Sequence, residues 1–519
     1  MASFRLKPEH VKEEFRNSIS DILSGRKECS PFPYVTFENF QSPEAVVNLR
    51  MDLANIKWYP RVNDLCSLDQ TRHFDDLEGE RYKLDHLKKF WTFMKDSFRS
   101  YLEDRTGVKL STEKLTMTGN RYGYTHHLLP HNDCVADRKY AFVFYLTERW
   151  TESHGGQHQL YAVNADNEPT KVERSLSPQC NQLVIFEVSD KSWHQVAEVL
   201  SQNNVRLSIN GWFHVDEAPK FASPPIVGPL RTFQIDTNFN VENEFARYIN
   251  LKVDEDESIK DLLQDEPFII MDRFLNLSRH NDEYLIRDLA ALPWTPATGP
   301  LQKRHFDVAE VDESQLHPDS SVRFLLTGVK SHMMCVYLSK WTGAKLAVSR
   351  KDPTPRTKLP IRYPETSGSP DSVSTNDSVE NLSDFEVLPD IRVACSLRRY
   401  KAGDYTTMDD QPATARSKEC VIDLKLFFSR LWSSEAENDR VPHVTGPGGS
   451  LQYYDSGADE VMYCYEPVHN QAVIVLREAD VKNFTKYVNS RAVNDYFYVI
   501  DCTYFGMERG VIEPLSVTL

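Results

Sequence analysis

Apolar side chains recur every three or four positions in three stretches of the first hundred residues, and this period predicts amphipathic helices. The first stretch covers residues 7–24, the second begins at Ser42 and Pro43, and the third ends at Thr106 and Gly107. Serine is a favoured helix N-cap, proline is accepted in the first turn, and glycine is a common C-terminal stop. The N-terminal part of the chain is therefore expected to be helical.

From about residue 115 the pattern changes to short apolar runs that are typical of buried strands. Such runs cover residues 140–146 and 182–188, and an alternating run covers 206–214. Helices followed by many strands predict an α+β fold. The expected sheet is a double-stranded β-helix, a jelly-roll barrel whose interior can hold a small ligand.

The second half of the chain repeats features of the first. The sequence LEDRTGVKL at 102–110 is echoed by LSKWTGAKL at 338–346, and NQLVIFE at 181–187 is echoed by NQAVIVL at 470–476. Internal repetition of this kind indicates duplication. The predicted fold class is therefore α+β, with two tandem jelly-roll modules that are each flanked by helices.

The predicted domain boundaries follow from this repeat and from composition. Residues 1–225 form the first module, 226–350 hold a linker and the helices of the second, and 391–519 form its barrel. Residues 351–390 are rich in Pro, Ser, Thr, Asp and Glu, a composition that predicts a disordered insertion.

Three side chains suggest a metal site in the first module. His131 and Asp133 stand two residues apart just before the run 140–146, read as the entry to a strand. Residues two apart on a strand point the same way, so both can face one ion while Asn132 points away. His194, which follows the run 182–188, is the expected third ligand. Two imidazoles and one carboxylate suit Fe(II) and leave coordination positions open.

A fourth side chain fits an anionic co-substrate. Arg206 follows His194 by 12 residues and opens an alternating, strand-like run. A guanidinium group is always charged and binds a carboxylate through two parallel hydrogen bonds, which lysine cannot do. Tyr145, in the strand after His131, could donate its hydroxyl to the same carboxylate. A zinc hydrolase fits less well, because it would not need Arg206 in this position.

The ordered set of His131, Asp133, His194 and Arg206 resembles that of the 2-oxoglutarate- and Fe(II)-dependent oxygenases. Within them, segments such as 141–146 and 206–214 resemble the eukaryotic ribosomal prolyl hydroxylases, a likeness that covers almost the whole chain. The resemblance implies Fe(II), 2-oxoglutarate and O₂, with ascorbate as reductant. It also implies hydroxylation at C3 of one proline in the small-subunit ribosomal protein of the decoding centre, which affects translation accuracy or termination.

Other histidines near the predicted site are expected to play smaller parts. His126, His127, His154 and His158 lack the strand spacing of the predicted ligands, so they are predicted to be loop or pocket-rim residues.

The second module is expected to lack the iron chemistry. Met-Asp-Asp at 408–410 stands where His131 and Asp133 would recur, and Asn483 stands where His194 would. No arginine occurs in the last strand-like run, 496–501, and His469 and Arg477 are read as ordinary surface or loop residues. This degenerate, metal-free barrel could serve stability, substrate docking or assembly.

The amino-acid composition limits the kinds of binding partner and the cellular compartment that are expected. The formal net charge of −16 argues against a general nucleic-acid binder and suits a basic protein substrate, as most ribosomal proteins are. Nine cysteines without a CxxC pair indicate reduced thiols. No apolar run suggests a membrane span or a signal peptide. A cytoplasmic protein is expected, with nuclear entry and oligomeric state left open.

Two other functions stay open at the level of sequence. The chain could be an oxygenase that hydroxylates another protein or removes an N-methyl group. It could also be a non-catalytic scaffold or an oxygen-responsive regulator that works through the second module.

Overall fold

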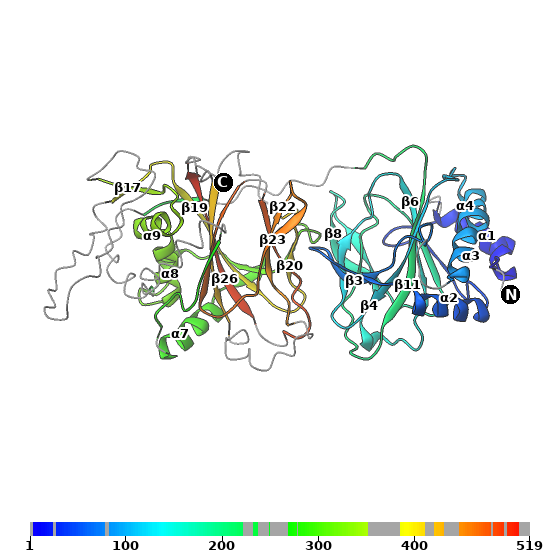
Figure 1. The fold of residues 1–519 in the computed structure, drawn as a ribbon, viewed down its shortest axis with the longest axis horizontal. Coiled ribbons are helices and arrows are strands. Elements are labelled where there is room, and N and C mark those ends of the chain that lie inside the picture. Colours follow the sequence, from blue (N-terminus) through cyan, green and yellow to red (C-terminus); the bar gives the residue numbers. More distant parts are fainter. Residues whose placement is uncertain are drawn as a thin grey trace, which may run out of the picture. The chain divides into compact units, whose positions relative to one another are not determined.

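The chain folds into two compact units. The computed structural model describes residues 4–23, 27–77, 83–221, 232–236, 249, 268–277, 279–350, 385–410, 420–429, 446–478, 481–492 and 496–507. One unit comprises Met1–Pro225 and Gly299–Arg304, and the other comprises Ile226–Thr298 and His305–Leu519 (Figure 1).

Helices cover one face of the first unit (Figure 1). They are α1 (Glu13–Leu23), α2 (Pro43–Asn55), α3 (Asp85–Phe93) and α4 (Arg99–Thr106), with a π-helical segment at Met94–Phe98 between the last two. Ser42 Oγ accepts a hydrogen bond from the Ala45 N–H at 3.2 Å and caps α2, as predicted. Gly107 ends α4 in the left-handed conformation, also as predicted. The predicted helix over 7–24 is instead a 3₁₀ turn at Pro8–Val11 followed by α1.

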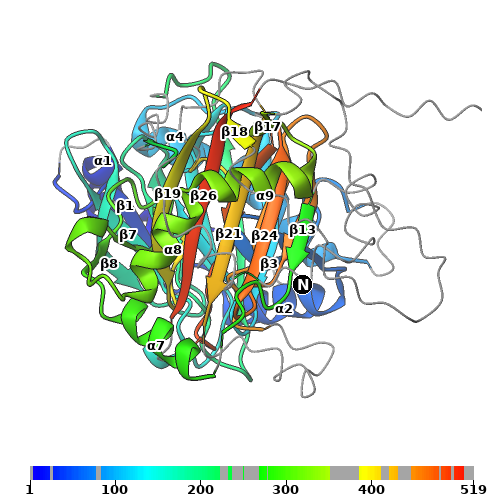
Figure 2. The ribbon, with the colours of Figure 1, turned by 90° about the vertical axis from the view of Figure 1, so that its left-hand side faces the viewer.

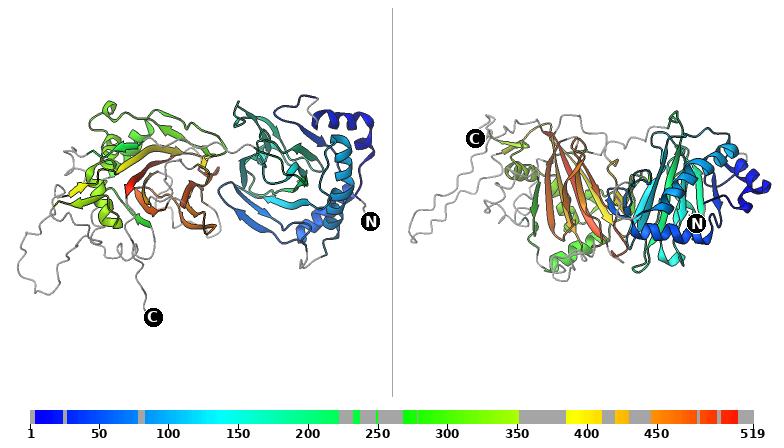
Figure 3. Two further views of the ribbon diagram at one scale, coloured as in Figure 1. Left: turned by 90° about the horizontal axis from the view of Figure 1, so that it is seen from above. Right: turned by 45° about the vertical axis from the view of Figure 1, so that its right-hand side comes forward.

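The strands of the first unit form one antiparallel sheet that curls around an interior (Figure 3, left). Its order is β1-β9-β6-β11-β4-β3-β5-β10-β7-β8, and β2 pairs with β3. The strands are β1 (Tyr34–Phe37), β2 (Tyr59–Val62), β3 (Cys66–Gln70), β4 (Leu115–Tyr122), β5 (His127–His131), β6 (Arg138–Tyr145), β7 (His158–Val163), β8 (Pro169–Leu176), β9 (Leu183–Glu187), β10 (His194–Val196) and β11 (Arg206–His214). An α+β fold with a curled, jelly-roll-like sheet is therefore confirmed.

The alternation of side chains along β6 decides which residues reach the interior of the sheet. Phe142 and Phe144 belong to the core shared with the helices, and the ring centroid of Phe144 lies 5.4 Å from that of Phe90 in α3. Val143 and Tyr145 lie on the opposite face. Burial of each large apolar side chain contributes about 1.5–3 kcal/mol, so a one-residue shift of register would be costly. Packing against the helices thus fixes Tyr145 inside the curled sheet.

The second unit has a sheet of similar order, β13-β24-β21-β26-β19-β16-β14, with β12 paired to β19. Smaller sheets pair β15 with β20, β17 with β18, and β22 with both β23 and β25. The strands are β12 (Thr232–Gln234), β13 (Phe268–Met271), β14 (Trp294–Pro296), β15 (Arg304–His305), β16 (Asp307–Ala309), β17 (Ala347–Ser349), β18 (Phe385–Val387), β19 (Arg392–Tyr400), β20 (Tyr405–Thr406), β21 (Cys420–Phe428), β22 (Leu451–Asp455), β23 (Glu460–Tyr465), β24 (Gln471–Arg477), β25 (Val481–Thr485) and β26 (Phe497–Met507).

Helices of the second unit also lie on one face of its sheet. Figure 2 shows α8 (Ser321–Val329) and α9 (His332–Thr342) across the strands β26 and β21, and α7 (Arg279–Ala290) lies beyond α8. Most of the predicted insertion, 351–384, lies outside the described residues, but its end contains strand β18. No helix among the residues that the structure describes is long and apolar enough to cross a membrane.

Candidate metal and co-substrate site

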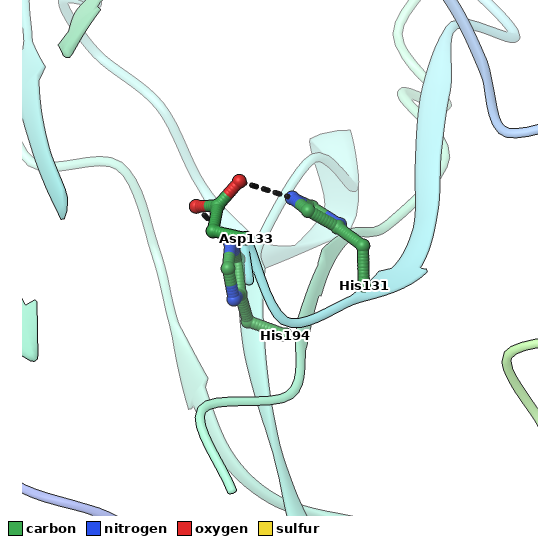
Figure 4. Close-up of side chains that lie close together, drawn as sticks. All are labelled: His131, Asp133 and His194. Atoms are coloured by element: carbon green, nitrogen blue, oxygen red, sulfur yellow. Dashed lines mark ion pairs between the residues drawn. The ribbon is translucent and has the colours of Figure 1, made fainter. Parts of the chain in front are cut away.

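The three predicted metal ligands meet where β5 ends and β10 begins. His131 is the last residue of β5, His194 is the first residue of β10, and the two are direct partners in the antiparallel pair. The Nε2 atoms of His131 and His194 lie 3.7 and 3.5 Å from the carboxylate oxygens of Asp133 (Figure 4). Within the described parts of the chain, this is the one group of three such side chains whose ligand atoms lie within 4.8 Å of one another.

Asp133 reaches this position in a way that differs from the prediction. It does not share a strand with His131 but lies in the loop after β5, and β6 begins only at Arg138. Its φ of +61° is a left-handed conformation, which aspartate tolerates better than most residues. Ser192 Oγ donates a hydrogen bond to the Asn132 carbonyl at 3.0 Å and ties this loop to the segment before His194. A fixed turn, and not the alternation of a strand, brings the carboxylate to the imidazoles.

Backbone hydrogen bonds set the orientation of both imidazoles. His131 Nδ1 lies 2.9 Å from the Leu129 carbonyl oxygen, and His194 Nδ1 lies 2.7 Å from that of Ser192. A carbonyl oxygen only accepts, so Nδ1 carries the proton and Nε2 keeps a lone pair toward Asp133. Burial, with the neighbouring His131, lowers the pKa of His194 to about 4. His194 is therefore neutral at physiological pH, as a metal ligand must be.

The carboxylate of Asp133 is held as an anion. Burial alone would raise its pKa, but attraction to the protonated forms of His131 and His194 and to Arg138 lowers it below its usual value. Arg138 Nη1 donates to Asp133 Oδ1 at 3.2 Å. Two imidazoles and one carboxylate form a donor set that suits Fe(II) and leaves coordination positions open.

Arg206 supplies a buried cation in the same curled sheet. It begins β11, is 1% exposed, and donates from Nε to the Gly156 carbonyl at 2.8 Å. Its guanidinium carbon lies 4.9 Å from the ring centroid of Tyr122 and 5.2 Å from that of Tyr145. No carboxylate of the described residues forms an ion pair with it. A buried charge without a counter-ion is costly, so this environment fits an anionic ligand.

Comparison with known proteins identifies the family. Residues 117–214 match the model of the 2OG-Fe(II) oxygenase superfamily. Residues 242–509, more than half of the chain, match the model "Oxoglutarate and iron-dependent oxygenase degradation C-term". The chain belongs to the oxoglutarate- and iron-dependent oxygenases. Members of this family use Fe(II), 2-oxoglutarate and O₂, and the donor set and the buried arginine described above fit these cofactors.

Two relatives match most of the length of this oxygenase, and a third matches less than half of it. The chain is 27% identical to "Prolyl 3-hydroxylase OGFOD1" of Xenopus laevis over 498 residues. This alignment covers 93% of this chain and 90% of that protein. It is 25% identical over 473 residues to "Prolyl 3-hydroxylase sudestada1" of Drosophila melanogaster, with coverages of 87% and 79%. It is 29% identical over 225 residues to "Prolyl 3,4-dihydroxylase OGFOD1" of Ostreococcus tauri, with coverages of 40% and 43%.

Two nearby histidines of the oxygenase are not the loop or rim residues that the sequence predicted. His158 begins β7 and is 1% exposed, and its Nδ1 lies 3.2 Å from the Tyr145 hydroxyl. His127 begins β5 and is also buried. His126 and His154 lie outside the strands, as predicted. The short apolar run 160–163, just after His158, was the signal in the sequence that could have placed this residue at the start of a strand.

The sequence analysis did not single out Tyr122, a further side chain beside Arg206. Tyr122 ends β4, is fully buried beneath Arg206, and its hydroxyl has no hydrogen-bond partner among the described residues. Buried hydroxyls are nearly always satisfied. An unsatisfied hydroxyl beside an unpaired guanidinium group fits a ligand that carries oxygen acceptors.

Arg477 and His469 were both predicted to be surface or loop residues. For Arg477 this prediction is wrong. Arg477 lies at the end of β24, is largely buried, and donates from Nε to the fully buried Asp423 at 2.7 Å. His469 does lie outside the strands, and its Nε2 is 2.9 Å from Asp282. The second unit therefore contains a buried ion pair that the sequence did not predict.

Proposed function

We propose that this oxygenase hydroxylates a prolyl residue of a protein substrate, with Fe(II) held by His131, Asp133 and His194. One observation carries the proposal: these three ligands face one point in the same curled sheet that buries the unpaired cation of Arg206. The relatives named prolyl 3-hydroxylase match up to 93% of the chain, and their names support a prolyl substrate.

Each residue of the site has a distinct task in the proposed reaction. Bound Fe(II), with 2-oxoglutarate and O₂, supplies the oxidation that inserts one oxygen atom into a C–H bond and releases succinate and CO₂. Arg206 binds the far carboxylate of 2-oxoglutarate through its guanidinium fork. The hydroxyls of Tyr145 and Tyr122, whose rings both lie near the guanidinium carbon of Arg206, would donate to the co-substrate. The burial of these side chains excludes water and strengthens their electrostatic hold on the dianion.

The proposed target is C3 of one proline in the small-subunit ribosomal protein of the decoding centre. The resemblance of the segments around the ligands to ribosomal prolyl hydroxylases supports this target. The net charge of −16 also suits a strongly basic partner. Modification of that protein would affect translation accuracy or termination.

A second candidate is hydroxylation of the same proline at both C3 and C4. The similarity of 40% of this chain to a protein named prolyl 3,4-dihydroxylase favours it. Product mass separates the two candidates, because one hydroxylation adds one oxygen atom and two hydroxylations add two.

The experiment that tests the proposal measures succinate release with Fe(II), 2-oxoglutarate and O₂, with and without a peptide from the decoding-centre protein. Peptide-dependent release with a gain of one oxygen atom supports C3 hydroxylation, and a gain of two supports the second candidate. Release without peptide modification would refute the ribosomal target. Restoration of every cellular effect of deletion by a His194→Ala protein would favour the non-catalytic scaffold.

We also infer that the second unit is a duplicated barrel that lacks the iron site. The order β13-β24-β21-β26-β19 parallels β1-β9-β6-β11-β4 and supports a common origin. In the first unit Arg206, at the start of β11, pairs with Tyr122, at the end of β4. In the second unit Phe497, at the start of β26, pairs with Tyr400, at the end of β19.

The change from arginine to phenylalanine removes the anion site. Phe497 stacks on Tyr400 with ring centroids 4.9 Å apart, so an apolar contact stands where the first unit has a cation above a tyrosine. Asn483 takes the place of His194 in the sequence alignment of the units and donates to Asp423 at 3.1 Å. The second unit is therefore proposed to act in stability, docking or assembly.

A further inference from the structure

His158 is a buried histidine, and only one of its two ring nitrogens makes a hydrogen bond to a described residue. Its Nδ1 lies 3.2 Å from the hydroxyl oxygen of Tyr145, whereas its Nε2 has no hydrogen-bond partner among the residues that the structure describes. The side chain is 1% exposed. A buried polar atom without a partner lowers stability, and such an atom in a native protein requires an explanation.

The position of His158 links the metal ligands to the co-substrate arginine. Its ring packs edge-on against that of His194, with centroids 5.2 Å apart, and against Phe186 at 5.9 Å. Its Nδ1 contacts Tyr145, whose ring lies 5.2 Å from the guanidinium carbon of Arg206. His158 thus contacts the Tyr145 hydroxyl, and the ring of Tyr145 lies near the guanidinium group that is proposed to bind 2-oxoglutarate.

The hydroxyl of Tyr145 has a single proton and can donate in only one direction. When it donates to His158, it cannot donate to a carboxylate on Arg206. A neutral imidazole can carry its proton on either nitrogen, so Nδ1 can instead donate to the Tyr145 oxygen. The tyrosine proton is then free for the carboxylate, and the two successive hydrogen bonds strengthen each other.

We propose that His158 is a positioning residue for 2-oxoglutarate that acts through Tyr145. Its Nδ1–H holds the tyrosine oxygen so that the hydroxyl proton points at the carboxylate bound by Arg206. This inference rests on the proposed function. It also explains the unsatisfied Nε2, because the imidazole serves binding at some cost to stability.

The proposal predicts different effects on binding and on stability. His158→Leu removes the unsatisfied Nε2 but also removes the partner of the buried Tyr145 hydroxyl, so these two effects on stability oppose each other and the thermal unfolding temperature stays close to that of wild type. The same substitution removes the hydrogen bond to Tyr145, so 2-oxoglutarate binds about tenfold more weakly. His158→Asn can place its amide N–H where Nδ1 stood, and it retains most of the affinity. A merely structural histidine would give the reverse pattern, with lower stability and unchanged affinity.

Calorimetric titration of 2-oxoglutarate into the full chain, loaded with Fe(II) under nitrogen, tests the proposal without turnover. The set comprises wild type, His158→Leu, His158→Asn, Tyr145→Phe and the double variant His158→Leu/Tyr145→Phe. If His158 acts through Tyr145, the double variant binds like Tyr145→Phe alone. Affinity for Fe(II) is the control and stays unchanged in all variants.

Two results would overturn the proposal. The first is wild-type affinity in His158→Leu, and the second is an affinity loss in the double variant equal to the two single losses combined. A wild-type protein that binds Fe(II) but no 2-oxoglutarate would instead refute the proposed function, so the two failures are distinguishable.

Discussion

The imidazole rings of His131 and His194 lie 4.2 Å apart between their centroids and belong to directly paired residues of β5 and β10. The backbone ladder between these strands therefore sets the separation of the two proposed iron ligands. The backbone pairing of β5 and β10 does not depend on these side chains. Either imidazole can therefore be removed without loss of the strand pair.

The first prediction concerns this pair. His131→Ala and His194→Ala should abolish succinate release, because one imidazole and one carboxylate do not complete the proposed donor set. The free energy of unfolding of the metal-free protein should change by only about 1 kcal/mol. Thermal unfolding measured under nitrogen with Fe(II) and 2-oxoglutarate should show stabilisation of wild type, about 2.7 kcal/mol at a hundredfold excess over Kd, and none in the variants.

The matched control for these variants is His154→Ala. His154 lies on the 3₁₀ helix Glu152–His154, outside the group of proposed ligands. It should keep both turnover and ligand-induced stabilisation. An Fe(II)-dependent shift of unfolding in His194→Ala as large as that of wild type would contradict the assignment.

The second prediction concerns the buried cation of Arg206. Arg206→Met and Arg206→Lys should each weaken 2-oxoglutarate binding about a hundredfold, because neither reproduces the two parallel hydrogen bonds of guanidinium. The Met variant should unfold at the temperature of the ligand-free wild type or above it, because it removes a charge that has no counter-ion. Calorimetric titration and thermal unfolding measure the two effects. Unchanged 2-oxoglutarate affinity in Arg206→Met would refute the role of Arg206.

The candidate site could be predicted from the sequence because its chemistry restricts residue types and their order. His131 and Asp133 precede an apolar run, His194 follows one and Arg206 begins one, so their association with strands was visible. The local geometry was not visible. Asp133 depends on a left-handed turn that is tied to Ser192, a contact between residues 60 positions apart.

The residues that the sequence analysis misjudged are those whose surroundings depend on long-range pairing. His158 is buried because β7 pairs with both β10 and β8, and no local pattern records these pairings. Asp423 and Lys425 lie on alternate positions of an apolar strand, which is a local sign of paired interior charges. Their partners, Arg477 and Asp501, come from strands more than 50 residues later.

The third prediction concerns the charges inside the second unit. Asp501 accepts from Lys425 Nζ at 2.5 Å and pairs with Arg398 at 2.8 Å. Burial alone would raise the pKa of Asp501, but Arg398 and Lys425 outweigh it and lower the pKa from 3.8 to about 2. The folded state therefore binds this proton more weakly than the unfolded chain. The resulting stability, about 2 kcal/mol, is present above pH 4 or so and is lost as the pH falls toward about 2.

Asp501→Asn should remove this pH-dependent contribution. It should also destabilise the protein at neutral pH by roughly 3–5 kcal/mol, because Arg398 and Lys425 lose their buried anion. Urea unfolding at neutral pH and along a series down to pH 2 measures both effects. Asp319→Asn is the control, since the side chain of Asp319 is 90% exposed, and it should leave both measurements unchanged. Equal stabilities of wild type and Asp501→Asn at neutral pH would contradict the prediction.

The last prediction concerns the turn that supports Arg206. Gly156 has a φ of +68°, and a Cβ placed on it would lie 3.1 Å from Cδ of Arg206. Gly107 has a nearly equal φ of +72°, but a Cβ there would meet no atom within 4 Å. Alanine at either position should cost about 1 kcal/mol through left-handed backbone strain. Only Gly156→Ala should also displace the guanidinium group and weaken 2-oxoglutarate binding, by about threefold to tenfold.

The control for this prediction is Gly107→Ala, which carries the same backbone strain without the contact to Arg206. A comparison of unfolding temperature and 2-oxoglutarate affinity between the two variants separates the two effects. Equal 2-oxoglutarate affinity in the two variants would show that the turn does not position Arg206.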